Sequence, residues 1–93
     1  MQIEFQRKIR GTDSQLSISI PARFINTYIL EPGQYVNVWF QDTDLKPTFQ
    51  SRKFASRISK CGLVGRIIYI PKQFAEDYKL SAGQEFYWKV EVL

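Results

Sequence analysis

Basic side chains are the residues whose type and spacing in this sequence point to a chemistry. Between Leu45 and Ala75 there are seven lysine and arginine residues and no aspartate or glutamate. A second basic group lies near the start of the chain, just before Gly11. The whole chain has a net charge of +4. Because cations without neighbouring acids create a field that attracts polyanions, the pattern favours contacts with phosphate groups.

The basic residues fall in front of two expected hairpins. The cations that we expect to contact phosphates on this ground are Arg7, Lys8, Arg10, Arg57 and Lys60. If the two halves of the chain are related by symmetry, these side chains should emerge on one side of the molecule. The alternative is a solvated basic edge, which keeps sheet edges from pairing with other chains.

Catalysis and metal binding have little support in the sequence. The chain has no histidine, which is the commonest general base and a common transition-metal ligand. Its carboxylates are scattered, with no metal-ligand spacing, and nothing is present to activate a serine. Gly62 and Gly65 are not followed by the Gly-Lys-Ser/Thr of a nucleotide-binding loop and are better explained as hairpin residues. We therefore expect no enzyme, no cofactor, no metal site and no small-molecule substrate.

Length and composition predict one domain inside the cell. A chain of 93 residues with 44% hydrophobic residues suffices for one modest core. The longest apolar runs are far shorter than the roughly 20 residues of a membrane span, and no secretory leader is recognisable. Cys61 is the lone cysteine, which favours a reducing, cytoplasmic environment. We expect it to be a small, buried or semi-buried side chain rather than a reactive thiol. We expect no membrane association.

The sequence repeats itself at an offset of fifty residues. When Leu16–Phe40 is compared with Arg66–Val90, eight of the 25 positions are identical. The pairs are Ile18/Ile68, Ile20/Ile70, Pro21/Pro71, Phe24/Phe74, Tyr28/Tyr78, Leu30/Leu80, Gly33/Gly83 and Gln34/Gln84. Upstream, FQRKI matches FASRI with one gap. We infer a duplication with an internal pseudo-twofold axis. Residues 1–93 then form a single barrel domain made of two repeats, 1–47 and 48–93.

Each repeat has the same expected order of elements. Residues 16–20 alternate between apolar and polar side chains, the period of a half-buried strand, and a proline follows in both copies. Residues 21–30 and 71–80 place aromatic residues four apart, as on one face of a short helix that must dock on a sheet. Gly33 and Gly83 are expected at turns with positive φ. Further strands are expected over 1–10, 36–40, 48–59 and 86–92, with a connecting turn at 42–47. The fold class is mostly β, a barrel with two short helices.

The order strand, hairpin, strand ending in Ile-Pro, short helix, Gly turn and strand resembles the SpoVT/AbrB-like swapped-hairpin transcription factors. The second copy, SRISKCGLVGRIIYIPKQFAEDYKLSAGQEFYWKVEV, resembles the family best, and the first keeps ISIPARF and LEPGQYVNV. The resemblance implies that the duplicated chain closes the swapped-hairpin barrel alone, as an intrachain pseudo-dimer that binds DNA. By position it adds Arg66 and Lys72 to the phosphate contacts. Leu16 stands opposite Arg66, and the second hairpin is one residue longer, which favours asymmetric recognition.

Two further features have competing interpretations. The polar loop over residues 12–15 contains donors and acceptors that suit base edges, but a hairpin turn is the simpler explanation. Aromatic residues in a small barrel are usually core, yet on outward faces they offer stacking platforms for nucleic acids. The candidates are Tyr35, Trp39, Tyr69, Tyr87 and Trp88, of which Tyr69 and Tyr87 fall opposite the main apolar stripes.

Together these observations predict a double-stranded DNA-binding protein. We expect a monomeric pseudo-dimer, for which further self-association remains open, acting as a transcriptional regulator or chromatin-like factor. The alternative is a protein-interaction module of the same fold, either antitoxin-like or binding a host factor. The predicted DNA contacts are Arg7, Lys8, Arg10, Arg57, Lys60, Arg66 and Lys72.

Overall fold

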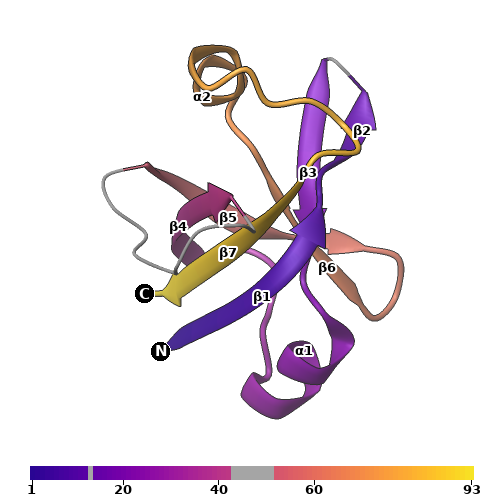
Figure 1. Cartoon of the computed structure of the whole chain (residues 1–93). Helices are drawn as coiled ribbons and strands as arrows, with labels where there is room; N and C mark the ends of the chain where they lie inside the picture. The colour runs from indigo at the N-terminus through magenta and orange to yellow at the C-terminus, as the bar shows by residue number, and fades with distance from the viewer. Residues whose placement is uncertain (13, 43–51) are drawn as a thin grey trace.

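The protein is described by a computed structural model that covers residues 1–12, 14–42 and 52–93. Antiparallel strands dominate it, with one short helix in each repeat (Figure 1). The elements are β1 (Gln2–Lys8), β2 (Arg10–Thr12), β3 (Gln15–Ser19), α1 (Ala22–Tyr28), β4 (Tyr35–Asp42), β5 (Lys53–Cys61), β6 (Gly65–Tyr69), α2 (Lys72–Asp77) and β7 (Glu85–Val92). Within the described residues the strand order is β1-β7-β4-β5-β6-β3-β2.

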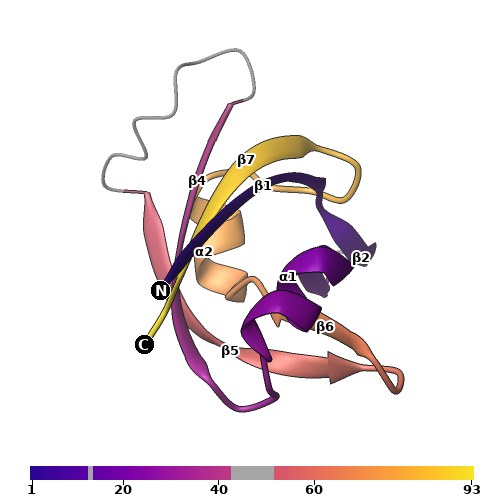
Figure 2. The same cartoon turned by 90° about the horizontal axis from the view of Figure 1, so that it is seen from below.

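The sheet curls so far that its two edge strands are neighbours in the sequence. The first and last strands of the order, β1 and β2, are consecutive segments separated at Ile9. Figure 2 shows the resulting barrel-like curvature. The predicted mostly β barrel with two short helices is confirmed.

The pairing register reveals the pseudo-twofold axis. Strand β3 pairs with β6 through Ile18 and Ile68, and β4 pairs with β7 through Trp39 and Lys89. In both pairs the partners are fifty residues apart, the same offset that relates the repeats. Residues related by a twofold axis can pair with each other only where the axis passes between them. The axis therefore runs through these two pairs.

The repeats are interwoven rather than stacked side by side. Strand β1 of the first repeat pairs with β7 of the second, and β5 of the second repeat pairs with β4 of the first. The registers are equivalent, since Phe5 lies opposite Trp88 and Phe54 lies opposite Val38. Each repeat thus supplies strands to both sides of the barrel, and neither half can bury its apolar face without the other.

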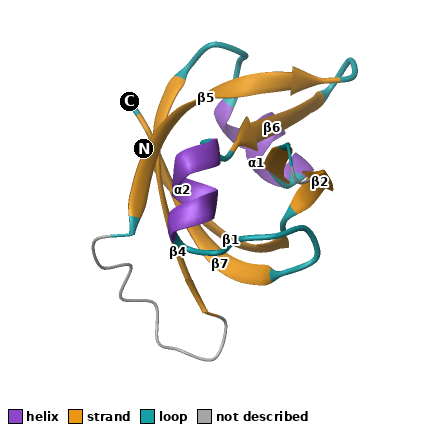
Figure 3. Cartoon of the chain, turned by 90° about the horizontal axis from the view of Figure 1, so that it is seen from above, coloured by secondary structure: helices purple, strands orange, loops and turns teal. Residues whose placement is uncertain are grey.

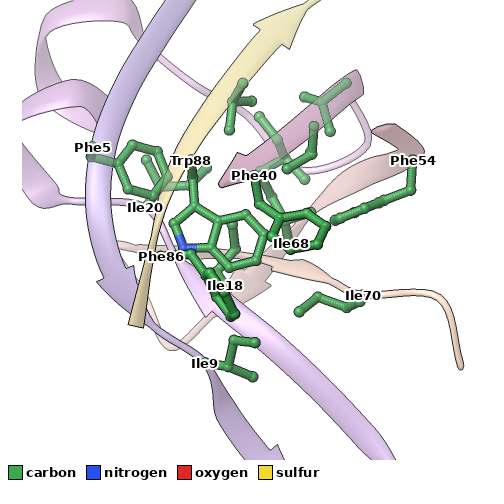
Figure 4. Close-up of a cluster of buried hydrophobic side chains, with 14 of the residues drawn as sticks. Phe5, Ile9, Ile18, Ile20, Phe40, Phe54, Ile68, Ile70, Phe86 and Trp88 are labelled. Atoms are coloured by element: carbon green, nitrogen blue, oxygen red, sulfur yellow. The ribbon is translucent and has the colours of Figure 1, made fainter. Parts of the chain in front are cut away.

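One hydrophobic core fills the interior. Inward-facing residues of β1, β3, β4, β5, β6 and β7 meet there, and Trp88, Phe40, Ile18 and Ile68 are among the most buried (Figure 4). Trp88 donates a hydrogen bond from its indole Nε1 to the carbonyl of Arg7 at 3.0 Å, which satisfies the one polar group of this large side chain.

Each helix docks its aromatic residues on the sheet, as predicted. In the first repeat the ring of Phe24 lies 6.0 Å from that of Phe5. In the second, Phe74 lies 4.8 Å from Phe54, which occupies the equivalent place. The two helices lie at opposite ends of the barrel (Figures 1 and 3). Neither described helix has the length and apolar character needed to span a membrane.

The turn after each helix ties one repeat to the other. Gly33 has φ 93° and donates to the carbonyl of Ile58 at 2.7 Å, and Gly83 has φ 94° and donates to the carbonyl of Ile9 at 2.8 Å. Both φ values lie in the region that favours glycine, as expected. The same turns explain the repeated Gln34 and Gln84, whose Oε1 atoms accept from the backbone N–H three residues earlier.

Three expectations need correction or fall outside the structure. Cys61 is exposed at the end of β5 rather than buried or semi-buried, because it adjoins the hairpin turn beyond the core. Asp42 belongs to β4 rather than to the connecting turn, since its backbone pairs with Phe86. The strand predicted over 48–59 begins at Lys53 among the described residues, and positions 43–51 lie outside them.

The axis pair Ile18–Ile68 should contribute strongly to stability. Both side chains are 0% exposed, so we expect Ile68→Ala to lower the free energy of unfolding by about 3 kcal/mol through lost burial and a cavity. Chemical denaturation measures this. Leu63→Ala, at an 87% exposed site, should change stability by less than about 0.5 kcal/mol. Equal losses for the two variants would contradict the assigned core.

Candidate nucleic-acid interface

The predicted cations occupy two separate corners of the barrel. Lys8 on β1 lies opposite Glu85, at the start of β7, and Arg57 on β5 lies opposite Tyr35, at the start of β4. Because β4 and β7 are antiparallel, their starts are at opposite ends of the sheet. The basic residues that were expected on one side of the molecule therefore form two groups, at opposite ends of the sheet.

The separation of the two corners follows from the strand geometry. From Tyr35 to Asp42, strand β4 advances seven residues, or about 24 Å at about 3.4 Å per residue. Lys8 and Arg57 are nevertheless on the same outward face of these strands, since their neighbours in β1 and β5 alternate with buried residues. The face therefore carries a basic residue near each end.

Three of the predicted cations converge on one hollow. Arg7, Lys8 and Arg10 line a hollow of about 540 Å³, which we call the cationic hollow. Its other described lining residues are Gln6, Ser19 and Glu85. The Nε of Arg7 is buried and has no hydrogen-bond partner among the described residues. A buried donor without a partner is energetically costly.

A single carboxylate faces these cations within the described lining. Glu85 lies opposite Lys8 in the strand pairing, and its Oε2 accepts a hydrogen bond from Nε2 of Gln6 at 2.9 Å. Against three cations it leaves the cationic hollow with a charge of +2. The field there attracts a phosphate rather than a cation.

The second repeat builds the same hollow from different side chains. The equivalent corner encloses about 390 Å³ and is lined by Tyr35, Ala55, Ser56, Arg57, Ser59 and Tyr69. We call it the tyrosine hollow. These six positions are equivalent to the six that line the cationic hollow. The offset is fifty residues for Tyr35 and Tyr69, and forty-nine for the residues of β5, where the alignment of the repeats has its gap. The duplication therefore kept a hollow at the equivalent place while its lining side chains diverged.

Arg57 is held by the tyrosine beside it. Its guanidinium carbon lies 4.5 Å from the centre of the Tyr35 ring, and Nη2 donates a hydrogen bond to the Tyr35 hydroxyl. Both side chains are exposed. The result is a planar cation stacked on an aromatic ring at the protein surface, an arrangement that orients the guanidinium.

The remaining predicted cations differ in their surroundings. Lys60, near the tip of the β5–β6 hairpin, and Lys72, the first residue of α2, are exposed. Arg66 is half-buried, and its Nε donates to the carbonyl of Leu30 at 3.0 Å while Nη1 donates to the carbonyl of Gly65 at 2.8 Å. These bonds give Arg66 a structural role at the end of α1, so we no longer assign it to phosphate.

The polar loop of the first hairpin has the features of a turn. The hydroxyls of Thr12 and Ser14 lie 2.9 Å apart, within hydrogen-bond distance. Gly11 has φ 110°, and a Cβ at that position would lie 2.1 Å from the carbonyl oxygen of Gln15. Only glycine fits there, which supports the turn interpretation over base reading. Asp13 lies outside the described residues.

The aromatic candidates separate clearly by burial. Trp88 is wholly buried and belongs to the core. Trp39 lies on the outward face with Nζ of Lys89 4.4 Å and Nζ of Lys53 5.4 Å from its ring centre. Tyr35 and Tyr69 are 55% and 38% exposed. Of the five candidates, these two tyrosines are therefore the most exposed rings.

Several lining residues were not among the sequence-based candidates. Gln6 and Ser19 complete the cationic hollow, and Glu85 opposes it. A signal for them existed in the repeat, because Glu85 is equivalent to Tyr35 and Ser19 to Tyr69. A position-by-position comparison of the two copies would have paired these residues. It would not have shown that they line hollows.

Comparison with known proteins extends the description of the fold. No protein-family model matches the sequence, and no curated protein matches it. Among solved structures the chain is similar to the solution structure of PHS018 from Pyrococcus horikoshii, with a TM-score of 0.61 and 20% identity. The similarity covers 97% of this chain and 87% of that one. It concerns the fold alone, and the resemblance to the SpoVT/AbrB-like family stays a prediction.

The structural role of Arg66 is open to a direct test. We expect Arg66→Leu, which copies Leu16 of the first repeat, to lower the free energy of unfolding by about 1–3 kcal/mol. The loss would come from the carbonyl of Leu30, which is left without its charged donor. Lys60 lies opposite Arg66 in the pairing of β5 with β6. Lys60→Leu therefore removes a charge of the same sign nearby and should leave stability nearly unchanged. Unchanged stability of Arg66→Leu in denaturation would return Arg66 to the phosphate contacts.

Proposed function

We propose that this protein binds double-stranded DNA through its two basic corners. The observation that carries the proposal is the cationic hollow, where Arg7, Lys8 and Arg10 surround a space with a net positive lining. The buried Nε of Arg7 has no hydrogen-bond partner in the part of the chain that the structure describes. A phosphate oxygen at this place would accept from Arg7 and be neutralised by Lys8 and Arg10.

The spacing of the two corners suits a duplex. About 24 Å of strand separates the corner at Lys8 from that at Arg57. Phosphates along one DNA strand are about 3.4 Å apart in projection on the helix axis, so the corners would span roughly seven nucleotides. Contacts to phosphates at two such places set the position of a duplex and need no particular base sequence.

The two corners do not offer equal contacts. The first has three cations, whereas the equivalent corner has Arg57, with Lys60 further along β5 and Lys72 on α2. We therefore propose asymmetric binding of modest sequence preference, as suits a transcriptional regulator or a chromatin-like factor. Affinity would come chiefly from release of counterions.

Salt dependence tests the proposal. With six phosphate contacts, the slope of log affinity against log salt should be about −5, at about −0.9 per contact. The double variant Lys8→Gln/Arg10→Gln should reduce that slope by about 1.8, because two contacts are lost. Fluorescence anisotropy with a random 20-base-pair duplex, over a series of salt concentrations, measures both values.

The control for this experiment is Arg23→Gln. Arg23 is an exposed cation of α1 whose guanidinium carbon lies 4.5 Å from the Phe24 ring centre, away from both hollows. It should leave the slope unchanged. If Lys8→Gln/Arg10→Gln binds duplex with the same slope as the unaltered protein, the cationic hollow is not a DNA contact.

One observation favours protein interaction as the second candidate function. The tip of the β5–β6 hairpin exposes Leu63 and Val64, which are 87% and 80% accessible. Two adjacent apolar side chains at an exposed tip are unusual in a region otherwise rich in cations, and exposed apolar clusters mark interaction sites.

The hairpin tip has its own test. The double variant Leu63→Ser/Val64→Ser should abolish capture of any specific partner from host lysate, since the apolar contact is removed, while duplex affinity remains the same. Affinity capture with both proteins, followed by anisotropy, gives the two readouts. A capture profile that is identical for the variant and the unaltered protein would exclude the tip as the interaction surface.

A further inference from the structure

A groove runs from the tyrosine hollow to helix α2. The tyrosine hollow shares the lining residues Ser56 and Tyr69 with a second hollow of about 530 Å³ beside α2, so that the two adjoin. The second hollow lies between α2 and the first hairpin and includes Gln15, Lys72 and Lys79. We call the combined space the α2 groove.

The α2 groove exists where the two repeats differ. In the second repeat Arg66 places its guanidinium on the carbonyl of Leu30 at the end of α1. The equivalent of Arg66 in the first repeat is Leu16, and the equivalent of Leu30 is Leu80; both line the α2 groove. A shorter, uncharged side chain therefore stands beside α2 where an arginine stands beside α1.

The lining of the groove combines rings and cations. Tyr35 lies at one end under the guanidinium of Arg57, and Tyr69 lies where the two hollows join. Lys72 and Lys79 continue along α2. Glu76 is the carboxylate among the described lining residues, so the groove has a net charge of +2. On the side of the cationic hollow, the positions equivalent to Tyr35, Tyr69 and Lys79 are Glu85, Ser19 and Ile29. The rings and the second lysine are thus particular to this side.

We propose that the α2 groove binds a single-stranded nucleic acid, independently of duplex binding at the cationic hollow. Bases would stack on Tyr35 and Tyr69, and phosphates would contact Lys72, Lys79 and Arg57. Bases in a duplex are stacked on one another, so their faces are available to tyrosine rings only when they are unpaired. Interleaved aromatic and basic side chains along a groove are what such a strand requires.

The repeat itself supplies the substitutions for the test. Tyr69→Ser and Lys79→Ile introduce the residues that occupy the equivalent positions of the first repeat, where the same backbone accommodates them. Lys79 has φ 54° and Ile29 has φ 50°, so the backbone at that site already accepts isoleucine. Neither residue belongs to the contacts proposed for the duplex, and Arg57 and Lys72 are left intact because they take part in both.

The measurement is fluorescence anisotropy with a labelled 12-nucleotide single strand of mixed sequence. Tyr69→Ser should weaken binding roughly ten-fold, since stacking of one base on a tyrosine is lost. Tyr69→Phe keeps a ring and should retain the affinity. Tyr28→Ser removes a tyrosine of similar exposure, 42%, on the opposite helix and should have no effect. Lys8→Gln/Arg10→Gln should weaken duplex binding and leave single-strand binding nearly unchanged.

The outcomes separate stacking from simple charge attraction. If Lys79→Ile weakens binding while Tyr69→Ser does not, or if inorganic polyphosphate of matched charge binds as tightly as the oligonucleotide, the groove is a polyanion surface and the proposal is wrong. Failure of the unaltered protein to bind the single strand, under conditions where it binds duplex, would also overturn it. Failure of duplex binding alone would overturn the proposed function and leave this inference standing.

Discussion

Pairing between the two repeats is the constraint on which the rest of the structure depends. At Ile18–Ile68 and Trp39–Lys89 the chain pairs with its own copy fifty residues away, and on either side each repeat gives its first strand to the last strand of the other. The backbone bonds of Gly33 and Gly83 repeat the same exchange at the turns. The single core is therefore built from inward-facing side chains of both repeats.

This interweaving explains how two related halves came to differ at the surface while keeping one core. The pairing register depends on backbone hydrogen bonds and on inward residues, so outward positions are free to vary. The cationic hollow and the tyrosine hollow are the clearest case. Of their six pairs of equivalent positions, only Lys8 and Arg57 share the same chemical character. A duplicated chain can alter one copy of a site without the other, which a dimer of identical chains cannot.

Much of the fold could be predicted because its determinants are local or repeated. Alternation over residues 16–20 and 86–92 indicates strands, and prolines before Phe24 and Phe74 indicate short helices that need a sheet beneath them. The identity of Gly33 with Gly83 indicates turns with positive φ. Repetition at one offset is strong evidence for an internal axis, and each of these inferences needs only a few neighbouring residues. The basic character of the chain, and the grouping of Arg7, Lys8 and Arg10 before Gly11, were likewise evident from sequence.

The arrangement of the candidate sites was decided only by tertiary structure. Lys8 and Arg57 occupy equivalent positions, but their partners Glu85 and Tyr35 come from the other repeat, and the antiparallel course of β4 and β7 sends the two to opposite ends. Arg66 lies within the basic run, yet its guanidinium bonds the carbonyl of Leu30, thirty-six residues away. A side chain's neighbours in a barrel depend on the register between distant strands. The sequence therefore determined the repeat, the elements and the charge, whereas the pairing between repeats decided which cations meet.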